Sequence, residues 1–236
     1  MSAPAPLVLA HRTCPLDERE NSLAGIDAAA RLGADGVEVD VRRSRDGSAV
    51  LLHDAWLTRV QHRPVRVSWL RDERLARLGV PTLAAALEAA CAAGLRVAID
   101  TKDPGAAGAT LAAVRATGHV DHVLLWSQHM PTVREYVRAL PDAEVALLRD
   151  TFDEAAHNRL LADAAAIGAR AVSAHQDVVT AEFVAAARER GLAVYCWYQQ
   201  LSVQRARLEA VAAAGLAGVV TDWPAAAREA LGRREG

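Results

Sequence analysis

The chain has 236 residues, 52% of them hydrophobic, with 27 basic and 29 acidic side chains. This length fits a single domain over residues 1–236, and the apolar content excludes a disordered chain. The formal charge of −2, without any block of like charges, argues against a nucleic-acid-binding protein.

Short strands rich in Val and Ile alternate with alanine-rich helices along the chain. Apolar strands in alternation with amphipathic helices predict a parallel sheet covered by helices. Strands are expected at Leu7–Ala10, Gly36–Val41, Arg96–Asp100, His122–Trp126, Glu144–Leu148, Arg170–Ser173, Ala193–Trp197 and Ala217–Thr221. Glycines that would end helices in a left-handed turn stand before five of these strands, at Gly33, Gly94, Gly168, Gly191 and Gly215.

The segment after the second strand departs from this alternation. Ala49–His53 follows the turn signal Asp46-Gly47, so we expect a short hairpin-like excursion from strand two. The stretch from Ala55 to Val80 is the least regular and is expected to form a loop over one barrel mouth. Eight strand–helix units in a chain of this length favour a (β/α)8 TIM barrel. A doubly wound open sheet is the alternative, but no glycine-rich phosphate-binding motif follows the first strand.

Three acidic residues stand where expected strands end, and TIM barrels carry their sites at those carboxyl ends. Glu38 and Asp40 are two apart on one strand and therefore share its inward face, and Asp100 closes another strand. Inward carboxylates without compensation cost roughly several kcal/mol each. A hard divalent cation, Mg²⁺ or Ca²⁺, would remove that cost. The alternative is that the three acids form buried salt bridges with Arg12 and Lys102.

Two histidines stand where apolar strands end, at the same side of the barrel: His11 directly after the first strand and His53 at the end of the excursion. Either one alone would be interpreted as a structural, hydrogen-bonded group. Together, beside a metal site, they suit a phosphodiester hydrolase, which needs a base for the attacking hydroxyl and an acid for the leaving alkoxide. Arg12 and Lys102 would bind the phosphate oxygens, the arginine through two N–H groups of its planar guanidinium and the lysine as a point charge.

Weaker candidates surround this set. Asp54 would orient His53 or serve a turn, and Glu20 would take part in the site or cap the first helix together with Asn21. Tryptophans at three strand ends are candidates for an apolar wall around a substrate head group: Trp126, Trp197 and Trp223. We select Trp197 among them as a substrate-binding residue.

These residues lie in strings that resemble the glycerophosphodiester phosphodiesterase family. The most specific strings are AHRTCPLDERENSL and GADGVEVDVRRSRDGSAVLLHD, and PTLAAALEA, IDTK, YCWY and GVVTDWP agree in order over Leu7 to Pro224. The resemblance implies a TIM barrel that uses one divalent cation and two catalytic histidines. Matched residue by residue, it implies His11 and His53 as the acid/base pair, Glu38, Asp40 and Asp100 as metal ligands, and Arg12 and Lys102 on the phosphate.

The resemblance also implies a reaction. A substrate hydroxyl next to the phosphate would attack first, and water would then open the resulting cyclic phosphate. A small-molecule glycerophosphodiester would thus yield glycerol 3-phosphate and an alcohol.

Two departures from the family pattern bear on this expectation. Thr13 stands where a glycine usually follows His-Arg, and Asp100 stands where glutamate is common. Related phospholipases of the sphingomyelinase-D type use aspartate there, so a phospholipase acting on lysophospholipids is one alternative. A catalytically inactive barrel that binds phosphodiesters is another, although the intact set of site residues argues against it.

The expected location is the cytoplasm. Three scattered cysteines, an odd number, indicate a reducing compartment. Met1–Ala10 lacks the basic and long apolar regions of a signal peptide. No run approaches the roughly 18 apolar residues of a membrane span, so stable membrane insertion is not expected.

Overall fold

The structure, a computed structural model, describes residues 5–149, 154–198 and 205–233. Its centre is a closed ring of eight parallel strands. The ring closes because β1 pairs in parallel with both β2 and β9. In ring order the strands are β1 (Leu7–Ala10), β9 (Gly218–Thr221), β8 (Ala193–Tyr198), β7 (Ala171–His175), β6 (Glu144–Arg149), β5 (Val123–Ser127), β4 (Arg96–Thr101) and β2 (Gly36–Arg43). This confirms the predicted (β/α)8 barrel and rules out the open sheet.

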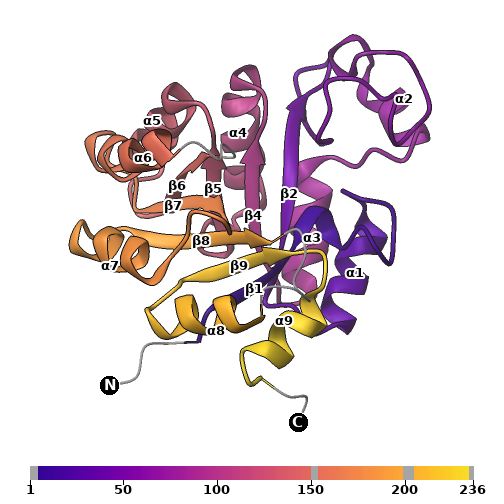
Figure 1. Cartoon of the computed structure of the whole chain (residues 1–236). Helices are drawn as coiled ribbons and strands as arrows, with labels where there is room; N and C mark the ends of the chain where they lie inside the picture. Colours follow the sequence, from indigo (N-terminus) through magenta and orange to yellow (C-terminus); the bar gives the residue numbers. More distant parts are fainter. Residues whose placement is uncertain (1–4, 150–153, 199–204, 234–236) are drawn as a thin grey trace.

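Helices surround the ring and connect its strands (Figure 1). They are α1 (Leu23–Arg31), α3 (Leu83–Ala92), α4 (Ala107–Thr117), α5 (Met130–Ala139), α6 (Glu154–Ala166), α7 (Ala181–Glu189), α8 (Arg205–Ala213) and α9 (Pro224–Ala230). All five glycines that were expected to end helices have positive φ, between 69° and 102°. Within the described residues, no helix combines the length and the apolar character needed to cross a bilayer.

The two faces of the strands have different environments. Alternate valines of β2, Val37, Val39 and Val41, belong to the large core between the ring and the helices. Glu38 and Asp40 therefore point inward, as predicted. Inside the ring, a smaller apolar cluster includes Leu9, Ala98, Leu124, Trp126, Ala146, Leu148, Ala171, Tyr195 and Val220. The barrel interior is thus a packed core, and polar side chains gather at one end of it.

The excursion after β2 lies outside the ring. Strand β3 (Ala49–Leu51) pairs antiparallel with β2, with Val41 opposite Leu51, as the predicted hairpin requires. It ends at Leu51, two residues earlier than expected, so His53 lies in the following loop.

The segment from 52 to 82 is more ordered than the predicted loop. It contains a 3-10 turn at Val67–Trp69 and the helix α2 (Asp72–Arg77), which Figure 1 places beside the carboxyl end of β2. Together with one residue of β3 it builds a small core of its own, made of Val50, Leu52, Leu57, Val67, Leu75 and Val80.

Candidate active site

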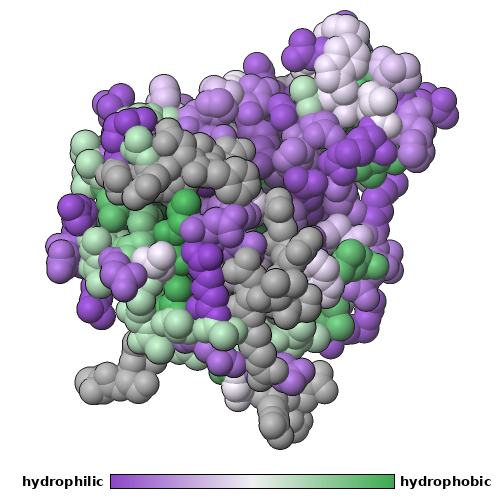
Figure 2. All heavy atoms as spheres, in the orientation of Figure 1, coloured by the Kyte–Doolittle hydropathy of each residue, from purple (hydrophilic) through white to green (hydrophobic). Residues whose placement is uncertain are grey.

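A cavity of about 190 Å³ opens at the carboxyl ends of the ring strands. Seven of the eight predicted site residues line it: His11, Arg12, Glu38, His53, Asp100, Lys102 and Trp197. Asp40, the eighth, is buried beside them with 1% of its surface exposed. Figure 2 shows that hydrophilic residues gather over the carboxyl ends of β2 and β4 on the face in view. Residues from strands distant in the sequence therefore meet in one polar pocket.

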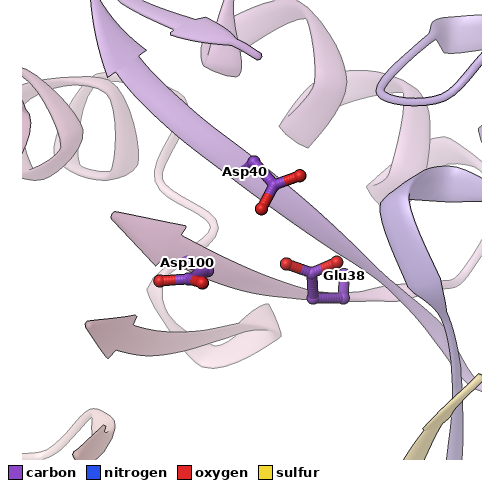
Figure 3. A group of neighbouring side chains, drawn as sticks. All are labelled: Glu38, Asp40 and Asp100. Carbon is purple, nitrogen blue, oxygen red and sulfur yellow. The ribbon is translucent and has the colours of Figure 1, made fainter. Parts of the chain in front are cut away.

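Three carboxylates come together on the adjacent strands β2 and β4. Glu38, Asp40 and Asp100 each offer an oxygen within 4.8 Å of the others, and all three side chains are buried. Asp40 and Asp100 are register partners across the two strands, and Figure 3 shows the carboxyl group of Glu38 turned toward the space beside them. Three convergent carboxylate oxygens are a donor set suited to a hard divalent cation such as Mg²⁺ or Ca²⁺.

Two cationic side chains also reach this cluster. The Nζ of Lys102 lies 3.1 Å from Oδ1 of Asp40 and 2.5 Å from Oδ2 of Asp100. The Nε of Arg12 lies 3.3 Å from Oδ2 of Asp40. Two basic groups cannot neutralise three carboxylates, so a negative charge remains when all are ionised.

The excess charge alters the acidity of the three carboxyl groups. Burial and the charge of Asp40 raise the pKa of Glu38 to about 7. Burial also raises the pKa of Asp100, although Lys102 opposes it. Burial acts in the same direction on Asp40, but Lys102 and Arg12 outweigh it and lower its pKa to about 2. Asp40 is therefore the permanently charged member, and Glu38 is the member that holds a proton near neutral pH.

Each histidine of the pocket is held by its own carboxylate. His11 Nδ1 lies 2.7 Å from Oδ1 of Asp222, and His53 Nδ1 lies 2.8 Å from Oδ1 of Asp54. Because an ionised carboxylate only accepts hydrogen bonds, Nδ1 carries the proton in both rings, and Nε2 remains for chemistry. Burial lowers the pKa of His11, but the hydrogen bond to Asp222 and the charge of Glu38 outweigh it and raise that pKa overall.

An unusual loop carries His11 and Arg12. Arg12, Thr13 and Cys14 all have left-handed φ values, 43°, 67° and 97°, a conformation that costs most residues energy. The turn directs the N–H of Arg12 to Oε2 of Glu38 at 3.0 Å. Thr13, which replaces the usual glycine, is fully buried, and its hydroxyl accepts the N–H of Ser22 at 3.0 Å. The side-chain hydrogen bond compensates for a backbone that would suit glycine better.

The loop packs closely on the first helix. Gly25 of α1 makes this approach feasible, because a Cβ there would lie 2.4 Å from the carbonyl oxygen of Thr13.

The role of Asn21 is not apparent from the sequence. This residue, also with positive φ, donates its amide N–H to Oδ2 of Asp40 at 2.8 Å and accepts the N–H of Asp40 at 3.0 Å. The cap of α1 is Ser22, whose hydroxyl accepts the N–H of Gly25. The capping interpretation of Glu20 and Asn21 is therefore wrong, since neither side chain caps the helix.

Asp222 was also missed, although the string GVVTDWP places it directly after β9, at the end where site residues gather. Of the three tryptophans considered for an apolar wall, Trp126 and Trp197 line the cavity. Trp223 is 37% exposed and is not among the lining residues.

A closed barrel with a polar, carboxylate-rich pocket at the carboxyl ends of its strands defines a TIM-barrel enzyme. The model of the glycerophosphoryl diester phosphodiesterase family matches residues 11–226. The chain belongs to this family of phosphodiesterases.

Known proteins of similar sequence or structure agree with this assignment. The glycerophosphodiester phosphodiesterase of Caldanaerobacter subterraneus is 25% identical over 92% of this chain and 94% of its own length. The crystal structure of the Thermotoga maritima glycerophosphodiester phosphodiesterase has a TM-score of 0.79 at 21% identity, covering 94% of this chain and 96% of that one. An Oleispira antarctica phosphodiesterase, solved in complex with the product sn-glycerol-3-phosphate, has a TM-score of 0.80 at 20% identity over 97% of both chains.

Proposed function

We propose that this protein hydrolyses glycerophosphodiesters to glycerol 3-phosphate and an alcohol, with one divalent cation and two histidines. The observation that carries the proposal is the meeting of three buried carboxylates and two carboxylate-held imidazoles in one cavity. The product bound to the Oleispira antarctica phosphodiesterase supports the substrate class.

Glu38, Asp40 and Asp100 would hold the cation, which would supply positive charge against the negative charge that develops on the phosphate. Asn21 keeps Asp40 oriented through two hydrogen bonds. Asp100 carries one methylene less than the glutamate common in the family, yet its oxygen still lies within 4.8 Å of the other two ligands.

The histidines would move the protons. With Nδ1 held by a carboxylate, the Nε2 of one ring accepts the proton of the attacking hydroxyl, and the Nε2 of the other donates a proton to the leaving alkoxide. His11 and His53 both line the cavity, one from the loop after β1 and the other from the loop after β3. Arg12 and Lys102, which line the same cavity, would bind the non-bridging phosphate oxygens.

An assay with glycerophosphocholine, with and without a chelator, tests this function. Formation of glycerol 3-phosphate that stops on chelation and returns with Mg²⁺ or Ca²⁺ is the expected result. Hydrolysis that survives exhaustive chelation would exclude the cation. Turnover of lysophospholipid or sphingomyelin in place of glycerophosphodiesters would establish the lipid-directed alternative. Binding of glycerophosphodiesters and lipids without turnover would establish an inactive barrel.

Cation binding should depend on pH. Because the pKa of Glu38 is raised to about 7, this ligand must lose a proton before it can bind the cation. We expect the affinity for Mg²⁺ or Ca²⁺ to rise about tenfold between pH 6 and pH 8, as one proton is displaced. Titration calorimetry in two buffers of different ionisation enthalpy measures both the affinity and the proton release. Equal affinities at the two pH values would contradict this expectation.

A further inference from the structure

Arg59 lies in the segment that follows His53 and Asp54, outside the ring of strands. Its guanidinium group makes three short contacts with two acidic side chains. Nε lies 2.7 Å from Oδ2 of Asp54, and the two terminal nitrogens each lie 2.7 Å from a different oxygen of Glu20. The contact with Glu20 is therefore bidentate, the geometry in which arginine binds a carboxylate most specifically.

Each of these two acids also holds a residue of the pocket. Oδ1 of Asp54 lies 2.8 Å from Nδ1 of His53. Oε2 of Glu20 accepts a hydrogen bond of 3.2 Å from Arg12. A continuous network of hydrogen bonds and ion pairs thus runs from the imidazole of His53 through Asp54, Arg59 and Glu20 to the guanidinium group of Arg12.

The electrostatics of the two acids agree with this arrangement. Burial raises the pKa of Glu20, but the hydrogen bond from Arg59 and the charge of Arg12 outweigh it and lower that pKa overall. Burial also acts to raise the pKa of Asp54, but the hydrogen bonds that it accepts from His53 and Arg59 outweigh burial and lower that pKa overall. Both acids therefore stay ionised, and each lies between Arg59 and one residue of the pocket.

We propose that Arg59 is a positioning residue that orients His53 and Arg12 together. Through Asp54 it fixes the orientation of the imidazole ring of His53, and through Glu20 it fixes the orientation of the guanidinium group of Arg12. The segment that contains Arg59 thereby sets the orientation of both His53, which follows β3, and Arg12, which follows β1. The proposal rests on the proposed roles of His53 and Arg12.

The two branches of this network, one through Asp54 and the other through Glu20, predict different kinetic effects. Asp54→Asn should lower mainly kcat, because His53 transfers a proton in the reaction. Glu20→Gln should raise mainly KM, because Arg12 binds the phosphate. Arg59→Ala should do both, lowering kcat/KM by about 10- to 100-fold, the usual effect of losing a residue that supports a site. Each double variant with Arg59→Ala should lose less than the product of the two single effects.

Two further variants separate positioning from folding. Arg63→Ala, in the same segment, removes an exposed arginine and should leave kcat and KM unchanged. Arg59→Lys keeps the charge but cannot make the bidentate contact and the third bond together, so it should restore activity only in part. Melting temperatures of all variants should lie near that of the wild type. If Arg59→Ala behaves as Arg63→Ala does, or loses activity only as far as it unfolds, the proposal is wrong.

A binding measurement makes the test independent of turnover. Calorimetry with glycerol 3-phosphate should show about tenfold weaker binding to Arg59→Ala than to the wild type, because Arg12 is no longer held. Unchanged affinity would overturn the proposal even if the wild type proves inactive. An inactive wild type whose affinity still depends on Arg59 would instead refute only the proposed hydrolysis.

Discussion

Replacement of His11 or His53 by alanine is expected to lower turnover of a glycerophosphodiester roughly 10²–10⁴-fold, the range for loss of a general acid or base. Both rings line the cavity, and each is oriented by a carboxylate through Nδ1. The fold should persist, because both side chains are only partly buried, with about a third of each exposed. The two losses should be far from additive, since the acid and the base act as a unit in the same reaction.

The measurement is the rate of glycerol 3-phosphate release at saturating substrate, with thermal melting recorded for each variant. His122→Ala is a matched control, because His122 is exposed and precedes the amino end of β5, opposite the pocket. It should turn over as the wild type does. Normal activity in either pocket variant would remove that histidine from the acid/base pair.

Replacement of Asp40 by asparagine is expected to weaken cation binding by more than about 100-fold, beyond the loss usual for a supporting residue. Asp40 is the member of the trio with the lowest pKa, about 2, so it supplies a full negative charge at neutral pH. The amide removes this charge but keeps an oxygen that can accept the hydrogen bond of Asn21. Hydrolysis should fall with the cation affinity, and added cation should restore part of it.

Titration calorimetry with Mg²⁺ and Ca²⁺ measures this effect directly. Glu38→Gln should weaken binding as well, and Glu88→Gln is the matched control, since Glu88 is 63% exposed on α3 and lies outside the pocket. If Asp40→Asn binds the cation as the wild type does, Asp40 is not one of its ligands. The salt bridges of Asp40 with Lys102 and Arg12 would then be its whole role.

The barrel could be predicted because its signals are local and repeated. Each apolar run indicates a strand, and each glycine at the end of a helical run indicates where that helix ends. Eight such strand–helix units in succession are compatible with few sheet topologies. The boundaries were less predictable. His122 was expected in a strand but lies in the 3-10 turn before β5, and β7 begins and ends later than its apolar run suggests. Hydrogen bonding with neighbouring strands, which composition does not encode, sets these limits.

The pocket was predictable where a residue type and its position on a strand agree, as for Glu38 and Asp40 on the inward face of β2 and Asp100 near the end of β4. Residues whose role depends on a partner distant in the sequence were missed. Asp222 is 211 residues from His11, and Arg59 is 39 residues from Glu20. Asn21 was considered for a helix cap because its neighbourhood in the sequence suits one, whereas its side chain contacts Asp40, 19 residues away.

The position of β3 outside the ring has a consequence for heat inactivation. The parallel hydrogen bonds that close the barrel do not pass through β3 or the segment from 52 to 82, and that segment has a small apolar core of its own. Such a unit can unfold locally while the rest of the protein keeps its structure. Each local opening would carry His53 away from the pocket. Loss of catalysis on warming would then follow the unfolding of this appended unit. The barrel itself would unfold at a higher temperature.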